Sequence, residues 1–110
     1  MQVTVERHDT YTEVRSEGRL NMVAAPKLKD VISSEISAGS RQIVVDLSAT
    51  EFMDSSGLGA LIGCLKMARQ AGGDLRIAQV PPQVLMVLQL TSMDRVLTPY
   101  PDSASAFSRA

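Results

Sequence analysis

The fold of this chain is decided by residues 44–65, whose sequence is VVDLSATEFMDSSGLGALIGCL. The beginning of this segment, together with Ile43, is aliphatic apart from Asp46, which is typical of a strand buried inside a sheet. Its end places apolar side chains at the i, i+3, i+4 and i+7 spacing of one helix face: Leu58, Leu61, Ile62 and Leu65. The segment therefore predicts a central strand followed by a helix with one buried face.

The junction between this strand and this helix carries three short oxygen side chains, Asp54, Ser55 and Ser56. Such side chains are favoured where a helix begins, because their oxygens accept hydrogen bonds from backbone amides that have no partner inside the helix. A reciprocal capping box is absent, since Leu58 and Gly59 stand where it would need Glu or Gln. We expect a serine hydroxyl at the positive end of the helix, and this junction is the candidate functional site.

Two glycines, Gly57 and Gly59, follow at the start of the same helix. Each costs about 1 kcal/mol relative to alanine in a helix interior, which suggests that something approaches the backbone closely. One explanation is a tight helix–sheet contact at Gly59 and Gly63. The other is a partner protein that reaches the serines. The sequence leaves both open.

Before the central strand, the pattern predicts an antiparallel hairpin near the sheet edge and then one helix. We expect the second hairpin strand to end before Gly18. Pro26 is tolerated only in the first turn of a helix, so the helix is expected to begin near residues 23–25, with Asn21 in the preceding loop. The two hairpin strands are expected at residues 2–7 and 11–16.

After the central helix, Gly72 and Gly73 are expected to end it, and Pro81-Pro82 to open a third helix. Strand, helix, strand around the centre implies parallel neighbours, whereas the hairpin is antiparallel. The sequence thus predicts a single-domain α/β fold over residues 1–110, with a mixed sheet of four to five strands packed with about four helices. Further short elements are expected at residues 75–80, 96–97 and 103–107.

Composition and charge argue against several classes of function. The 110 residues are 45% apolar, and 11 basic against 12 acidic side chains give a net charge of −1, which argues against nucleic acid as a ligand. The lone cysteine, Cys64, lies inside the apolar helix pattern and fits a reducing cytoplasm. The longest apolar run, residues 58–65, is too short to span a membrane, and residues 1–7 contain no apolar stretch of the signal-peptide kind.

Catalytic motifs are not found. A hydrolase elbow needs Gly two residues before its serine, and Met53 stands there before Ser55. The only histidine, His8, falls in the expected hairpin turn with nothing local to orient it as a base. No Gly-x-x-x-x-Gly-Lys loop exists, and one histidine, one cysteine and scattered carboxylates predict no metal site. We therefore expect no enzyme activity, no cofactor and no metal.

The segment from Phe52 to Gly59, FMDSSGLG, together with the preceding Asp-Leu-Ser, resembles the STAS-domain anti-sigma factor antagonists of bacterial partner-switching systems. The likeness extends over nearly the whole chain, through Gly18-Arg19-Leu20, Ala25-Pro26, Gly72-Gly73 and the Pro-Pro-opened helix. The resemblance implies a non-enzymatic switch. Its members bind an anti-sigma factor that is also a serine kinase and so free a sigma factor, and a metal-dependent serine phosphatase reverses the phosphorylation.

The resemblance also implies roles for residues. The phosphorylated serine follows the motif aspartate, which makes it Ser55 here, and Ser56 is assigned to capping and local geometry. The partner-binding surface is expected to include Asn21, where the family often has an aspartate. Met53 is the better candidate for an exposed apolar contact, possible also at Met93, and Leu58 for the core. The expected partner-binding residues are Asn21, Met53, Asp54, Ser56, Gly57, Leu58 and Gly59.

Phosphate on Ser55 would add about −1.5 to −2 charges at pH 7, beside Asp54. The helix N-terminus stabilises an anion by roughly 0.3–1 kcal/mol, so we expect the fold to persist and the partner to be repelled at the surface. The alternative is a STAS module that is never phosphorylated, such as a scaffolding subunit of a lipid transporter or of a stressosome-like assembly.

Overall fold

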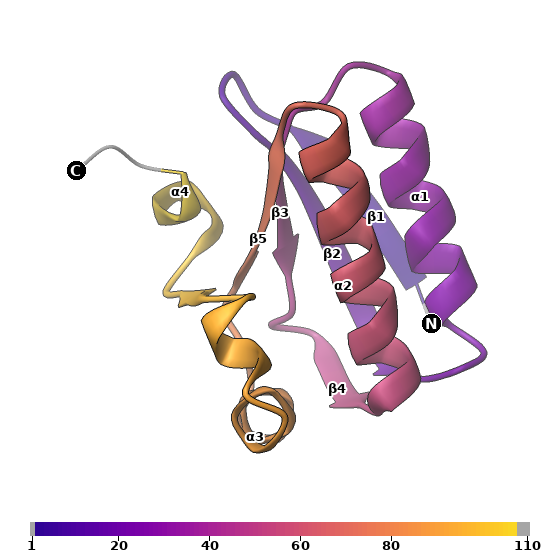
Figure 1. Cartoon of the computed structure of the whole chain (residues 1–110), viewed down its shortest axis with the longest axis vertical. Helices are drawn as coiled ribbons and strands as arrows, with labels where there is room; N and C mark the ends of the chain where they lie inside the picture. The colour runs from indigo at the N-terminus through magenta and orange to yellow at the C-terminus, as the bar shows by residue number, and fades with distance from the viewer. Residues whose placement is uncertain (1, 108–110) are drawn as a thin grey trace.

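The computed structural model describes residues 2–107, in which six strands form one mixed sheet (Figure 1). Its strand order is β1-β2-β3-β5-β6, and β4 pairs with β2 beyond the end of β3. Only β1 and β2 pair antiparallel, while the other four pairings are parallel. The strands are β1 (Gln2–Arg7), β2 (Thr12–Leu20), β3 (Gln42–Asp46), β4 (Thr50–Met53), β5 (Asp74–Ala78) and β6 (Pro99–Tyr100).

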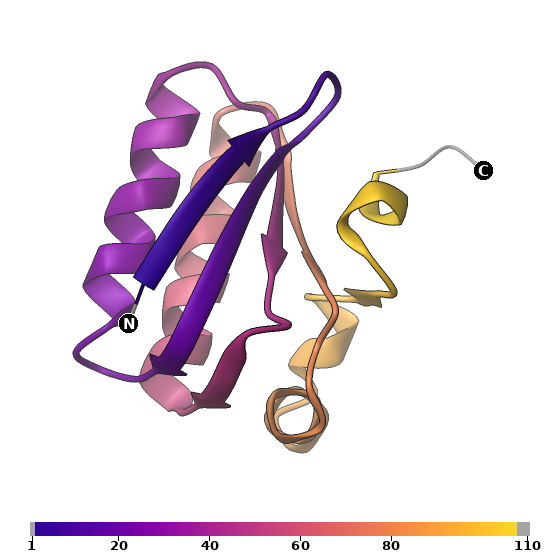
Figure 2. The same cartoon turned by 180° about the vertical axis from the view of Figure 1, so that it is seen from behind.

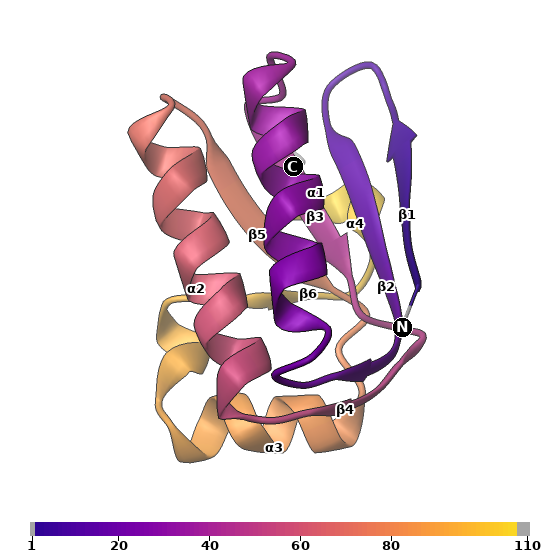
Figure 3. The same ribbon diagram turned by 90° about the vertical axis from the view of Figure 1, so that its right-hand side faces the viewer.

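Two long helices lie side by side on one face of the sheet, α1 (Ala25–Ser37) and α2 (Ser55–Gln70), as Figures 1 and 3 show. Between them and the sheet lies the main core, which includes Val14, Ile32, Val45 and Leu61, all fully buried. Figure 2 shows the opposite face, where the hairpin β1–β2 is open to view. Three shorter elements complete the chain: α3 (Pro82–Leu90), the 3₁₀ turn η1 (Met93–Arg95) and α4 (Ser103–Ala106).

The predicted fold class is confirmed, as are the hairpin at the sheet edge, the parallel neighbours of the central strand and the helix starts near Ala25 and Pro82. The expected end of the second strand before Gly18 is wrong. β2 continues to Leu20, because Gly18 adopts a φ of +92° that glycine accommodates, and the pairing register shifts directly after it. This shift separates the part of β2 that pairs with β3 from the part that pairs with β4.

Two short strands were not predicted where they lie. β4 is a four-residue strand in the segment expected to be a loop, and it brings the sheet to six strands, one more than expected. The last strand is Pro99–Tyr100 rather than residues 96–97, since Leu97 is buried in the core while Val96 closes the 3₁₀ turn. Within residues 2–107, no helix combines the length and apolar character needed to cross a membrane.

Candidate functional site

The candidate site lies where the parallel strands β2 and β4 end side by side. Leu20 and Met53 are register partners at the carboxyl ends of these strands. The backbone amide of Asp54 donates to the carbonyl oxygen of Leu20 at 3.3 Å. The residues that follow each strand, Asn21 and Asp54, therefore emerge at the same edge of the sheet, although they are far apart in the sequence.

Asp54 is the N-cap of α2. Its backbone is extended (φ −107°, ψ −173°), and its side-chain Oδ1 accepts a hydrogen bond from the amide of Gly57 at 3.0 Å. Its carbonyl oxygen accepts from the amide of Leu58 at 3.0 Å. The expectation that Ser56 caps the helix is wrong, because Asp54 already supplies the capping oxygen and Ser56 is the second helical residue.

Ser55 is the first residue of α2 and is exposed to solvent. Among residues 2–107, its hydroxyl has no hydrogen-bond partner, so it is not committed to a structural contact. The cap leaves Ser55 at the end of the helix that carries the positive partial charge. A nucleophilic or modifiable hydroxyl is therefore presented at this edge without any need to disturb the core.

The glycines of α2 differ in their surroundings. A β-carbon on Gly57 would collide with the carbonyl oxygen of Leu20 and lie 2.8 Å from its Cγ. The tight helix–sheet contact, one of the two explanations that the sequence left open for these glycines, is therefore at Gly57 and not at Gly59 and Gly63. Gly59 is exposed, and within residues 2–107 nothing lies within 4 Å of a β-carbon added there. A β-carbon added at Gly63 would lie 3.7 Å from the Lys29 side chain, an ordinary contact distance.

The expectation that Met53 is an exposed contact residue is wrong. Its side chain is 0% exposed, because the pairing of β4 with β2 turns it into the main core. Leu58 is buried as expected, and Met93 is half-buried against the same core. Of the expected partner-binding residues, Asn21, Asp54, Ser56 and Gly59 retain accessible surface, whereas Met53, Gly57 and Leu58 are buried.

The turn before α1 adds an exposed apolar surface that the sequence did not reveal. The side-chain oxygen of Asn21 accepts hydrogen bonds from the amides of Val23 and Ala24, both at 3.1 Å, and its carbonyl accepts from Ala25. This holds a tight turn on which Met22 is 72% and Val23 84% exposed. The only signal in the sequence is the pair of large apolar residues directly after Asn21, a residue type that favours such turns.

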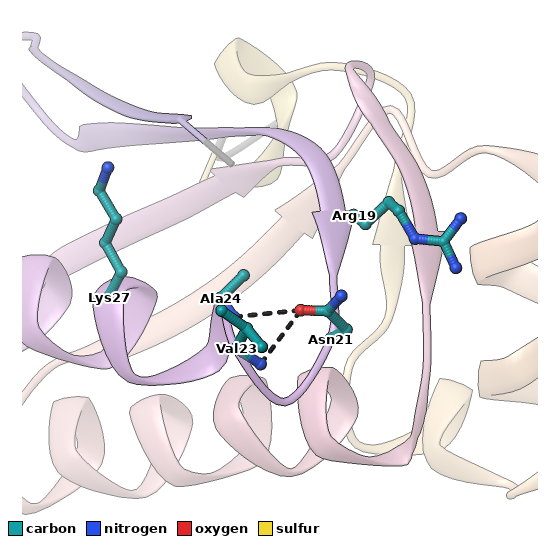
Figure 4. Close-up of a pocket in the computed structure, with 5 residues that line it drawn as sticks. All are labelled: Arg19, Asn21, Val23, Ala24 and Lys27. Atoms are coloured by element: carbon teal, nitrogen blue, oxygen red, sulfur yellow. Dashed lines mark hydrogen bonds between the residues drawn. The ribbon is translucent and has the colours of Figure 1, made fainter.

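A pocket of about 450 Å³ lies beside this turn and is lined by Arg19, Asn21, Val23, Ala24 and Lys27. Figure 4 shows Arg19 and Lys27 on opposite sides of the Asn21 turn. The Arg19 guanidinium stacks over the ring of Phe52 on β4, 4.5 Å from its centre. The edge thus combines an exposed serine, exposed aliphatic side chains and cationic groups, a mixture suited to an interface with another protein.

His8 lies far from this edge. It belongs to the β1–β2 turn, which Figure 1 shows at the opposite end of the sheet from the junction of β4 and α2. There it stacks on Tyr11 with ring centres 4.4 Å apart, and its Nε2 lies 3.7 Å from a Glu6 oxygen. His8 therefore cannot act as a base for Ser55, and within residues 2–107 there is no other histidine.

The carboxylates are less scattered than the sequence suggested. Ligand atoms of Glu6, His8 and Glu13 lie within 4.8 Å of one another at the hairpin, where both glutamates are exposed or half-exposed. Exposed acidic groups are common without a metal, so this cluster alone does not define a metal site.

Comparison with known proteins gives a consistent result. The family model of the STAS domain matches residues 2–106. The "Anti-sigma-B factor antagonist" of Staphylococcus aureus is 29% identical over 93 residues, which cover 84% of this chain and 86% of that protein. The "Anti-sigma F factor antagonist" of Paenibacillus polymyxa is 28% identical over 109 residues, 98% of this chain and 93% of that protein. The crystal structure of an anti-sigma factor antagonist from Mycobacterium paratuberculosis has a TM-score of 0.84 at 30% identity, covering 96% of this chain and 89% of that one.

Proposed function

This chain belongs to the STAS-domain family, and on that premise we propose that it is an anti-sigma factor antagonist switched by phosphorylation of Ser55. In the unmodified state it binds an anti-sigma factor that is also a serine kinase, and this binding releases a sigma factor. Phosphorylation of Ser55 ends the interaction, and a metal-dependent serine phosphatase restores it. The whole chain, residues 1–110, serves as one binding domain without catalysis of its own, and it works in the cytoplasm.

The single observation that carries this proposal is the exposed, uncommitted hydroxyl of Ser55 at the start of α2. A kinase needs such a hydroxyl at the surface, and Ser56 is less exposed. The names of the relatives add support, since each is an antagonist of an anti-sigma factor.

The partner-binding surface is centred on this serine. It comprises the exposed surface of Ser55 and Gly59, the side of the Asn21 turn, and the apolar side chains of Met22 and Val23. Exposed aliphatic groups around a polar centre provide the buried area that a protein interface requires. Asp54 also lies at this edge, but its oxygen already accepts from Gly57, so its first role is to fix the helix start.

Phosphorylation acts on this surface by charge and bulk. The phosphate adds about −1.5 to −2 charges at pH 7 next to Asp54. The helix N-terminus stabilises the anion by roughly 0.3–1 kcal/mol, so the fold is retained. Binding is lost because a partner surface that accommodates a small neutral hydroxyl meets a large dianion instead.

The direct experiment incubates the chain with a candidate anti-sigma kinase and ATP and follows the intact mass. We expect a gain of one phosphate, which peptide mapping places on Ser55, and no gain in the Ser55→Ala variant. Ser56→Ala serves as the matched control and is phosphorylated normally. A wild-type chain that binds its partner without ever accepting phosphate would instead support the scaffolding alternative.

A further inference from the structure

The free edge of β4 is closed by a side chain from α3. Gln83 accepts a hydrogen bond from the amide of Met53 at 2.9 Å through Oε1 and donates one to the carbonyl of Met53 at 3.2 Å through Nε2. β4 pairs with β2 on its other side only. The Gln83 amide therefore occupies the position that a further strand would take, and it satisfies both backbone groups of one residue.

This contact lies directly before Asp54 and Ser55, the residues that open α2 and are called the phosphoacceptor turn below. Met53 precedes the N-cap Asp54, and Ser55 follows Asp54. On the β2 side, the same turn is held by the bond from Asp54 to Leu20 and by the close contact of Gly57 with Leu20. On the other side, Gln83 is the residue that fixes the backbone leading into the turn.

Gln83 is itself held firmly. It is the second residue of α3, directly after Pro82, and the carbonyl of Pro81 accepts from the amide of Leu85 at 2.9 Å. The next residue, Val84, is fully buried and anchors the helix in the main core. Proline at the first position of α3 restricts the backbone φ angle there, so the backbone that carries the Gln83 side chain is held in place.

We propose that Gln83 is a positioning residue for Ser55, which joins α3 and the phosphoacceptor turn into one rigid unit. This inference rests on the function proposed above. It deepens that proposal because it names a residue that would act on the switch by orienting Ser55, without contacting a partner protein. A displacement of α3 would be transmitted through the paired hydrogen bonds to the backbone at Met53 and so to Ser55.

The first test measures amide hydrogen exchange by NMR in the full chain. In Gln83→Ala both hydrogen bonds are lost, and in Gln83→Glu the ionised carboxylate cannot donate to the Met53 carbonyl. We expect exchange at the Met53 amide to accelerate about tenfold or more in Gln83→Ala, relative to the core amide of Val45. The acceleration is smaller in Gln83→Glu, whose carboxylate still accepts from the Met53 amide. The control is Gln89→Ala, which removes an exposed glutamine from the same helix. We expect it to leave the ratio of the exchange rates at Met53 and Val45 unchanged.

The ratio separates positioning from general stability. A purely structural role would accelerate Met53 and Val45 equally through global unfolding, and that result, or an unchanged ratio in Gln83→Ala, would overturn the proposal. The second test uses the kinase that phosphorylates the wild-type chain. We expect kcat/KM for Ser55 to fall about tenfold in Gln83→Ala, mainly through kcat, because the acceptor is less well oriented.

The two proposals fail in different ways. If no kinase phosphorylates the wild-type chain, the switch is contradicted, and the exchange ratio alone decides whether Gln83 fixes the turn. If the wild-type chain is phosphorylated and Gln83→Ala is phosphorylated with the same kcat and KM, the positioning role is rejected while the switch stands.

Discussion

Gly57 lies against the carbonyl oxygen of Leu20 so closely that no β-carbon fits between them. The same oxygen accepts the hydrogen bond from the amide of Asp54, so it cannot move away without loosening the helix start. We expect Gly57→Ala to lower the free energy of unfolding by about 1–2 kcal/mol, since overpacking exceeds the gain in helix propensity. Urea denaturation monitored by circular dichroism measures this change.

Gly59→Ala is the matched control for that variant, because a β-carbon at Gly59 meets nothing within 4 Å. Here only the helix propensity changes, and we expect the free energy of unfolding to rise by up to about 1 kcal/mol. Equal destabilisation by the two alanine substitutions would show that the Leu20 contact is not what requires glycine at position 57.

The apolar turn gives a prediction for binding without a change in stability. Met22 and Val23 are 72% and 84% exposed, so replacing both with serine should alter the free energy of unfolding by no more than about 0.5 kcal/mol. Affinity for the anti-sigma partner should fall about tenfold or more, as measured by isothermal titration calorimetry. Leu90→Ser on α3, where the side chain is 79% exposed, should leave the affinity unchanged. An unchanged affinity after the substitution of Met22 and Val23 would place the interface elsewhere, and an equal loss in both variants would show that the effect is not specific to this turn.

Asn21 allows charge to be tested separately from geometry. Its Oδ1 accepts from the amides of Val23 and Ala24, and an aspartate oxygen can accept the same bonds. We expect Asn21→Asp to keep the thermal stability of wild type while changing partner affinity, whereas Asn21→Ala should cost about 1 kcal/mol of stability through the two lost hydrogen bonds of the turn. Thermal melts and partner titrations of both variants make the comparison. Identical affinities for Asn21 and Asn21→Asp would exclude this turn from the interface.

Cys64 reports on opening of α2. Burial raises the pKa of its thiol to about 11, and the nearby Lys29 lowers it only in part. At pH 8 the thiolate is therefore scarce in the native state, and its fraction increases as the pH rises towards 11. We expect alkylation of the native chain at pH 8 to be slow and to accelerate in urea in step with unfolding. Rapid labelling of the native chain at pH 8 would contradict the buried position of Cys64.

The sequence was sufficient for features that depend on neighbouring residues. Asp54 and Ser55 at the helix start, Gly72 after its end and Pro82 at the start of α3 are all as predicted, because caps, glycines and prolines act within one turn of chain. The grouping of Asn21 with Asp54 rested on family resemblance, and the parallel pairing of β2 with β4 provides its physical reason.

Features that depend on distant residues were missed. β4 has only four residues and exists because Gly18 allows β2 to change partner, a long-range pairing that no local pattern encodes. The burial of Met53 and its bonds to Gln83 follow from that pairing. The exposure of Val23 likewise depends on how the Asn21 turn projects from the fold. Its apolar character alone would predict a buried side chain.

The central claim is that a phosphate on Ser55 abolishes partner binding while the fold persists. The most direct measurement is the dissociation constant of the anti-sigma partner for the unmodified chain and for Ser55→Asp, with both folds checked by NMR. We predict affinity lower by about a hundredfold or more for Ser55→Asp, together with amide spectra that differ only around residues 53–59. Ser55→Asp that binds its partner as tightly as wild type would contradict the account.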